Sequence, residues 1–255
     1  MEDAEFIKKR FAELADRCYR ENRYTFTDFL GLGELASFYE TERSLPVPYT
    51  LYGGIDTAER VILRFGSEEM LGYEEAFPIA LVEIKPLLSK FADELTHRDI
   101  LGALMSLGIE REVLGDIYLK DNVAYVACLS TMVEYIAGEL TSVKHTSVTC
   151  RVLTAFPEGL AGEAEELSLG VASERIDGII AKAFNLSRND VNELFRQKKI
   201  FLNGRLCENN SRMLKKDETV TVRGYGRLIF REITGMSRKG KLYARVDCLG
   251  RAGRK

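Results

Sequence analysis

The chain has 255 residues, with 36 Lys and Arg against 39 Asp and Glu, and a formal net charge of −3. This length predicts two domains or three small ones, and the ordinary apolar content allows sizeable cores. No window approaches 18 consecutive apolar residues, and the charged N-terminal segment lacks the apolar stretch of a signal peptide, so we expect a cytoplasmic protein with no membrane partner.

The first 74 residues are expected to form an N-terminal α/β domain. Residues 2–22 have the charged, amphipathic pattern of a helix, and a second helix is expected over residues 27–39, with Thr27 or Asp28 as its cap. The prolines and glycines of SLPVPYTLYGG, residues 44–54, break the helical pattern. RVILRFG, residues 60–66, is typical of a short strand.

Residues 75–160 alternate between strand and helix patterns. We expect a strand at 77–86, a helix capped by Thr96 with Asp99, a hairpin turning at Asp121-Asn122, a helix at 130–140 and a strand at 141–153. This β-α-β-β-α-β order is that of the ferredoxin-like fold, which hosts many RNA-binding modules. The segment lacks the aromatic RNP1 pattern of a standard RNA-recognition motif, so the fold alone says little about function.

The segment PEGLAGEAEELSLGVAS, residues 157–173, is acidic and contains glycines, which predicts a connector. After it the charge balance changes. Residues 171–255 hold 20 of the 36 basic side chains and 9 of the 39 acidic ones, which gives +11 there and −14 in the rest of the chain. A basic region on an acidic body is typical of a nucleic-acid-binding module on a carrier.

Two helices and several strands are expected in this basic region. A helix from Ser173 has an apolar face, and a second helix follows the capping box of Ser187 and Asp190. IFL, residues 200–202, predicts a strand, Asn203-Gly204 a tight turn, and residues 227–249 a β-hairpin turning at 238–241. The apolar faces of the two helices comprise Ile176, Ile179, Ile180, Ala183 and Phe184 in the first, and Val191, Leu194 and Phe195 in the second.

The second helix also predicts a polar stripe. Arg188, Asn192, Arg196 and Lys199 are spaced by 4, 4 and 3 residues, so they share one helix face. With no acidic partner expected on that stripe, these donors indicate a phosphate-binding surface.

Three blocks of the basic region resemble the S4 RNA-binding domain, the αL motif: ERIDGIIAKAF (174–184), SRNDVNELFRQKKIFLNG (187–204) and LKKDETVTVRG (214–224). Together with PYTLYGGIDTAERVILRFG (48–66) and HRDILGALMSLGIEREVLGDI (97–117), they resemble the bacterial YlmH family over nearly the whole chain. The resemblance implies a non-catalytic, monomeric protein of translation that binds ribosomal RNA, and tRNA as a further candidate, on the large ribosomal subunit. It also implies a role in ribosome-associated quality control of stalled peptidyl-tRNA, and members are encoded near cell-division genes.

The sequence therefore predicts an α+β protein with three domains. They are an N-terminal α/β domain (1–74), a central ferredoxin-like domain (75–160) and a C-terminal S4 domain with a β-hairpin extension (171–255). Neither a cofactor nor a metal is expected, because the five cysteines are far apart and form no close ligand pair. The residues expected to contact RNA are Arg175, Ser187, Arg188, Asn192, Arg196, Lys198, Lys199, Asn203, Gly204, Arg205, Arg212, Lys215 and Lys216.

Two other functions stay open at this point. Arg175-Ile176-Asp177 resembles the R-L-D catalytic block of pseudouridine synthases, so an RNA-modifying enzyme is one alternative. The other is an adaptor in cell division, for which the acidic body would be the contact surface.

Overall fold

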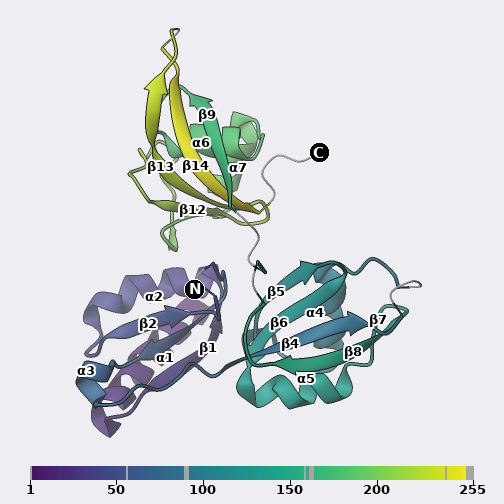
Figure 1. The fold of residues 1–255 in the computed structure, drawn as a ribbon. Coiled ribbons are helices and arrows are strands. Elements are labelled where there is room, and N and C mark those ends of the chain that lie inside the picture. Colours follow the sequence, from purple (N-terminus) through teal and green to yellow (C-terminus); the bar gives the residue numbers. More distant parts are fainter. Residues whose placement is uncertain are drawn as a thin grey trace. The chain divides into compact units, whose positions relative to one another are not determined.

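A computed structural model describes residues 2–250 except 56, 89–91, 158, 161–163 and 239. The chain forms two compact units, Met1–Ala161 and Gly162–Lys255. Both units combine helices with antiparallel sheets (Figure 1), so the expected α+β class is confirmed. The division into three domains stays a prediction.

The first unit begins with a three-stranded antiparallel sheet of order β1-β3-β2, covered by helices. Phe11 of the first helix and Phe38 of the second meet edge to face at 5.4 Å between ring centroids, inside one buried cluster. The elements are α1 (Glu2–Glu21), β1 (Thr25–Leu30), α2 (Leu32–Thr41), β2 (Tyr49–Tyr52), β3 (Val61–Phe65) and α3 (Glu68–Leu71).

The helix expected over residues 27–39 is wrong in its first part. Thr25–Leu30 is a strand, and the helix begins at Leu32, after Gly31 as its cap. TFTDFL alternates as a strand does, and the buried Thr27 hydroxyl accepts a hydrogen bond from the Leu63 backbone N–H at 3.0 Å. Residues 49–52, expected only as a break, form strand β2 because they pair with β3.

The rest of the first unit is a five-stranded antiparallel sheet of order β5-β6-β4-β8-β7. Helices α4 and α5 pack on one of its faces, against Val82 and Ile84 of β4 and Val126 of β6. The final strand expected at 141–153 is confirmed over residues 146–153, whereas its first residues fold back on it as a short hairpin, in which Lys144 has a left-handed φ of 54°. The elements are β4 (Ile79–Pro86), α4 (His97–Ser106), β5 (Leu114–Lys120), β6 (Val123–Leu129), α5 (Val133–Glu139), β7 (Ser142–Val143) and β8 (Thr146–Leu153).

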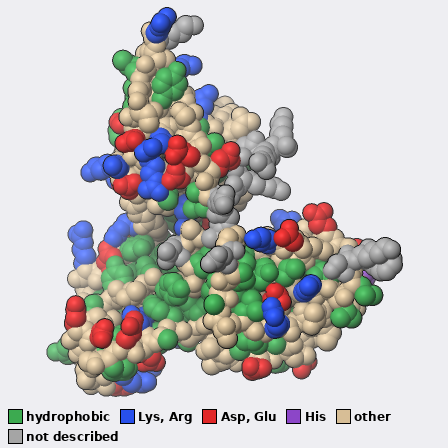
Figure 2. Space-filling view, viewed as in Figure 1, with side chains coloured by type: hydrophobic (Ala, Val, Ile, Leu, Met, Phe, Trp, Pro, Cys, Tyr) green, Lys and Arg blue, Asp and Glu red, His purple; other side chains and the backbone are tan. Residues whose placement is uncertain are grey.

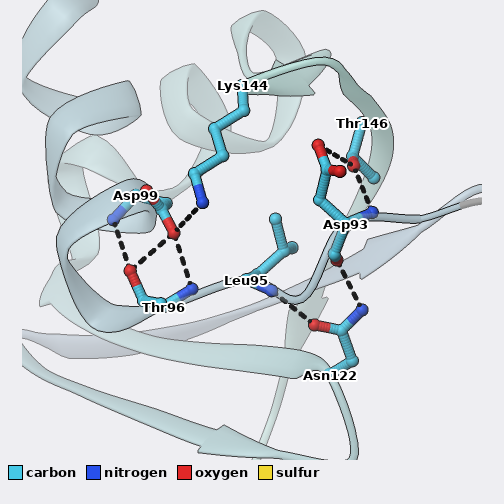
Figure 3. Close-up of polar contacts among 7 residues, drawn as sticks. All are labelled: Asp93, Leu95, Thr96, Asp99, Asn122, Lys144 and Thr146. Carbon is cyan, nitrogen blue, oxygen red and sulfur yellow. Dashed lines mark hydrogen bonds and ion pairs between the residues drawn. The ribbon is translucent and has the colours of Figure 1, made fainter.

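Polar side chains fix the start of α4 (Figure 3). The expected capping box is confirmed: the Asp99 carboxylate accepts hydrogen bonds from the Thr96 backbone N–H at 2.8 Å and the Thr96 hydroxyl at 2.5 Å. Lys144 of the short hairpin adds an ion pair to the same carboxylate at 2.7 Å. The Lys144 and Thr96 hydrogen bonds lower the pKa of Asp99 to about 2. The β5–β6 turn also contributes, since the Asn122 side chain accepts from the Leu95 N–H at 2.8 Å.

The second unit packs two helices on a six-stranded antiparallel sheet of order β11-β10-β12-β13-β14-β9. All eight residues expected on the two apolar helix faces are buried in this core. The elements are β9 (Glu165–Val171), α6 (Ile176–Ala183), α7 (Arg188–Arg196), β10 (Ile200–Leu202), β11 (Arg205–Leu206), β12 (Thr219–Val222), β13 (Gly226–Met236) and β14 (Leu242–Gly250).

Two expectations for this unit are wrong. The end of the expected connector is strand β9, because residues 165–171 pair with β14 along their whole length. The first helix begins at Ile176 and not at Ser173, with Arg175 as its extended N-cap residue. The hairpin of β13 and β14 is confirmed, and it belongs to the main sheet of the unit.

Candidate RNA-binding surface

Helix α7 begins at a closed capping box that positions Arg188 at its first turn. The Ser187 hydroxyl accepts from the Asp190 N–H at 3.1 Å and donates to the Asp190 carboxylate at 2.7 Å. The same carboxylate accepts from the Ser187 N–H at 3.1 Å, and these bonds lower the pKa of Asp190. Ser187 is therefore occupied as a helix cap, whereas the Arg188 side chain is exposed.

The polar stripe of α7 differs from expectation in three respects. Lys199, expected on the same helix face, lies beyond the end of the helix, because α7 ends at Arg196 and Lys198 has a left-handed φ. Arg196 lies 3.2 Å from the Glu193 carboxylate, so the expected absence of an acidic partner is wrong. Both side chains of this pair are largely exposed, and such pairs contribute little. Asn192 accepts a hydrogen bond from the Asn210 side chain at 3.0 Å.

Four cations lie near the end of α7: Arg196, Lys198, Lys199 and Arg223. The helix ends at Arg196, Lys198 has a left-handed φ of 54°, and the Lys199 N–H donates to the Leu194 carbonyl at 3.0 Å. The Lys199 carbonyl accepts from the N–H of Arg223 at 2.9 Å, which brings the end of β12 beside it. Arg223 is exposed and was not among the expected contacts, although it lies in the third S4-like block.

The expected turn at Asn203-Gly204 is confirmed, because both residues have positive φ, 50° and 78°. It joins β10 to β11. The Asn203 side-chain oxygen accepts from the Thr219 N–H at 2.8 Å, and the Asn203 N–H donates to the Thr219 carbonyl at 2.8 Å. Asn203 thus ties the turn to β12, and Gly204 lets a ligand approach the backbone closely.

A hollow of about 460 Å³ lies beside this turn. Arg212, which contributes to its lining, pairs with the Glu218 carboxylate at 2.8 Å, and Glu218 also accepts from the Lys215 N–H at 2.8 Å. Lys215 and Lys216 are exposed at the turn that precedes β12. The lining residues are Leu202, Asn203, Arg205, Leu206, Cys207, Glu208, Asn209 and Arg212.

Arg175 is held by the carboxylate beside it. Its guanidinium lies 2.8 Å and 3.1 Å from the two oxygens of Asp177. Hydrogen bonding to Arg175 lowers the pKa of Asp177, with further contributions from the Gly178 N–H and the charge of Arg188. Asp177 is therefore an ionised partner of Arg175 on α6.

A second hollow, of about 360 Å³, lies near the start of α7. Three cations from separate segments contribute to its lining: Lys182 of α6, Arg188 of α7 and Lys241 after the β13–β14 turn. Sequence reasoning missed Lys182 and Lys241, because the fold of the sheet brings Lys241 here from far along the chain.

Most of the expected RNA contacts therefore fall into three groups. Within the described part of the chain, Arg188, Lys199, Lys215 and Lys216 are in no ion pair, whereas Arg175, Arg196, Lys198 and Arg212 each contact a carboxylate. Ser187, Asn192 and Asn203 use their side chains in internal hydrogen bonds.

The cysteines contribute no chemistry to this surface. Burial raises the pKa of Cys128 to about 12 and those of Cys150 and Cys248 to about 11. In the residues that the structure describes, no three His, Cys, Asp or Glu side chains are grouped as metal ligands. No described helix is long and apolar enough to cross a membrane.

Comparison with known proteins gives a family, a relative and a solved structure to which this chain is similar. Residues 73–155, the central sheet and its helices, match a family described as "Putative RNA-binding domain in YlmH". The "Ribosome-associated protein quality control protein P2" of Bacillus subtilis (strain 168) is 25% identical over 223 residues, which cover 86% of this chain and 85% of that protein. The solved structure of "Cell division protein ylmH from Streptococcus pneumoniae" is 19% identical, with a TM-score of 0.48, and covers 59% of this chain and 91% of that one.

The family match lies in the central sheet and not in the basic second unit, so the comparison assigns an RNA-binding name to the part of the chain with the weaker sequence signal. The relative from Bacillus subtilis, in contrast, spans most of the chain. The resemblance of this chain to the YlmH family, which its sequence motifs indicated, is thereby confirmed.

Proposed function

We propose that this protein is a non-catalytic, cytoplasmic RNA-binding protein that associates with the large ribosomal subunit through ribosomal RNA, with tRNA as a further ligand. Its role would be quality control of stalled peptidyl-tRNA complexes. The observation that carries this proposal is the series of cations from the exposed Arg188, at the start of α7, to the half-buried Lys199 and the exposed Arg223, at its end. Phosphate groups would replace the counterions of these side chains.

The second unit would act as an S4-type module. Its two packed helices, the turn at Asn203-Gly204 and the basic turn before β12 follow one another in the order of the S4-like blocks. Arg188 and Arg196 are eight residues apart, so the stripe between them is about 12 Å long. A rigid basic helix face of this length suits phosphates of a structured RNA, whose positions are fixed.

The first unit supports an RNA-binding function on separate grounds. Its central sheet has the strand order of a ferredoxin-like module, β5-β6-β4-β8, and matches a family named for RNA binding. The relative from Bacillus subtilis is named for ribosome-associated quality control, and it aligns along both units of this chain. A monomer that contacts RNA through both units is consistent with these findings.

The state of Asp177 favours binding over catalysis. The carboxylate of a pseudouridine synthase must attack its substrate, whereas both oxygens of Asp177 accept hydrogen bonds, from Arg175 and the Gly178 N–H. Its pKa is lowered mainly by Arg175, as in a surface ion pair. We therefore assign Asp177 to holding Arg175 in place.

The test replaces Arg188, Arg196 and Lys199 with Ala in the full chain. The affinity for large ribosomal subunits and for a ribosomal RNA stem-loop should fall, and the salt slope should decrease by roughly one per lost phosphate contact. A matched control replaces Lys9, Arg17 and Arg20, exposed on α1, with Ala, which removes the same charge from the first unit.

Sedimentation through a sucrose gradient and filter binding at several salt concentrations give the readout. The control should keep both the affinity and the salt slope. If the α7 variant is folded and binds like the control, the proposed surface is wrong.

A further inference from the structure

The central sheet has a second face that α4 and α5 do not cover. Side chains alternate along each strand, so Val82 and Ile84, which pack under the helices, leave Glu83 and Lys85 on the opposite face. The N-terminal sheet covers one end of that face, where Phe29 and Ile62 pack on Ala127. The remainder is exposed or half-buried.

Strand register places two polar rows on this remainder. In the first row, Tyr118 of β5 lies opposite Tyr125 of β6, Tyr125 opposite Glu83 of β4, and Glu83 opposite Arg151 of β8. In the second row, Lys120 lies opposite Val123 and Lys85 opposite Thr149. We call these eight residues the tyrosine face. Figure 2 shows hydrophobic side chains, a class that includes tyrosine, beside Lys and Arg over this sheet.

The charge of the tyrosine face is opposite to that of the acidic body around it. Among the eight residues, Lys85, Lys120 and Arg151 outnumber the one carboxylate, Glu83, which lies 3.2 Å from Arg151. The Asp116 carboxylate lies beside the row, against Tyr118. Lys85 and Lys120 are exposed and, within the described residues, in no ion pair. A strongly acidic protein partner would suit these cations but leave the tyrosines unexplained.

The two tyrosines of the row have different surroundings. Tyr118 contacts Phe156 edge to face, with ring centroids 6.4 Å apart, and its hydroxyl lies 3.2 Å from the Asp116 carboxylate. Tyr125 is half-buried, and burial together with the charge of Glu83 raises its pKa, so its phenol is neutral at physiological pH. Rings on neighbouring strands, whose backbones lie about 4.8 Å apart, can stack on successive bases.

We propose that the tyrosine face binds a short unpaired segment of RNA, with bases stacked on Tyr118 and Tyr125 and phosphates beside Lys85, Lys120 and Arg151. Stacking on aromatic side chains tolerates any sequence, and cations beside the rings follow the backbone. This inference deepens the proposed RNA-binding function, because it adds a single-strand site on the first unit to the structured-RNA site on the second. It also explains how a sheet without an RNP1 pattern can bind RNA, since its tyrosines are contributed by β5 and β6 through register.

The test measures fluorescence anisotropy of a short unpaired RNA of mixed sequence and of a closed stem-loop, each titrated with the full chain. Tyr125→Leu should weaken binding of the unpaired RNA about tenfold and leave the stem-loop unaffected. Tyr125→Phe, which keeps the ring, should retain the affinity. Tyr135→Leu is the matched control, because Tyr135 is 45% exposed on α5, under the opposite face.

A second variant does not depend on any half-buried residue. Replacing Lys85 and Lys120 with Gln should reduce the salt slope for the unpaired RNA by about 1.4, at roughly 0.7 per single-strand phosphate. Both side chains are exposed, so folding should be unaffected.

The outcomes separate this inference from the proposed function. If Tyr125→Leu and the lysine variant bind the unpaired RNA like the Tyr135→Leu control, the tyrosine face is not an RNA site. Equal loss in Tyr125→Leu and Tyr125→Phe would also overturn the stacking argument. Full RNA affinity combined with the loss of a protein partner in Tyr125→Leu would make the face a protein-docking surface instead. If the α7 variant binds the stem-loop like the parent while Tyr125→Leu still weakens binding of the unpaired RNA, the proposed α7 surface is wrong and this site stands.

Discussion

Lys198 occupies a backbone position that normally belongs to glycine. It follows the last turn of α7 with a φ of 54°, and the N–H of the next residue, Lys199, closes the helix end on Leu194. The left-handed conformation costs an L-residue about 1–2 kcal/mol, whereas glycine adopts it freely. The ion pair of Lys198 with Glu208, at 3.7 Å between exposed side chains, is too weak to offset this cost.

We predict that Lys198→Gly separates stability from binding. Because relief of strain exceeds the entropy cost of glycine, the free energy of unfolding should stay the same or rise by up to about 1 kcal/mol. The affinity for RNA should fall, with a salt slope lower by about one, because a phosphate ligand is lost. Urea unfolding and filter binding measure the two effects.

Lys198→Ala is the control for this prediction, because it removes the cation and keeps the strain. Both variants should therefore bind RNA equally weakly, and only the glycine variant should gain stability. Unchanged RNA binding in both would mean that Lys198 is not a ligand.

At the scale of elements, the start of α4 depends on charge. The Asp99 carboxylate joins the helix to Lys144 of the β7–β8 hairpin, and its pKa is lowered to about 2 from an ordinary 3.8. A lowered folded-state pKa stabilises the fold at pH values above the unfolded-state value, and this stabilisation is lost as the pH falls towards the folded-state value.

We therefore predict that Asp99→Asn lowers the melting temperature at pH 7, and that the difference from the parent shrinks as the pH falls from about 5 to about 2. Thermal unfolding followed by circular dichroism across this range measures the difference. Asp16→Asn, at an exposed position on α1, removes the same charge and should have little effect. A difference that stays constant down to about pH 2 would show that the ion pair does not stabilise the native state.

The sequence predicted helix starts and turns correctly where the residues that determine them are neighbours in the chain. The capping boxes at Thr96 and Ser187 and the turns at Asp121-Asn122 and Asn203-Gly204 all occur as expected. Residues 27–30 of β1 were expected to begin a helix, because so few residues fit the start of a helical pattern as well as a strand. Its identity depends on pairing with β3, far along the chain.

The same contrast between local and long-range determinants applies to the candidate surfaces. The part of the stripe from Arg188 to Arg196 could be predicted because its members share one helix. The end of the helix before Lys199, and the pairing of Arg196 with Glu193, were not predicted. Lys241, Arg223 and the row of Tyr118 and Tyr125 could not be found from spacing. Strand register places Tyr118 opposite Tyr125, and a shift of one residue would place the tyrosines in the core. The folding of the second sheet separately brings Arg223 beside Lys199 and Lys241 into the hollow near Arg188.

At the scale of the whole molecule, the charge distribution of the two units predicts bivalent RNA binding. The basic second unit carries the α7 surface, and the acidic first unit carries a local basic area at the tyrosine face. Two sites joined by one chain raise the effective concentration of the second binding step, and avidity can exceed either affinity by about 10²–10⁴. A ligand that joins a stem-loop to an unpaired tail should engage both.

We predict that such a composite RNA binds the full chain more tightly than either of its parts. The losses in binding free energy from Tyr125→Leu and from the α7 triple variant should add to within about 0.5 kcal/mol on the composite RNA, because the residues share no partner. Filter binding of the parent, both variants and their combination closes this cycle, with Tyr135→Leu and the α1 triple variant as controls. A composite RNA that binds no more tightly than its stem-loop would refute bivalency. If Tyr125→Leu lost as much binding free energy on the stem-loop alone as on the composite RNA, both surfaces would contact the same RNA element.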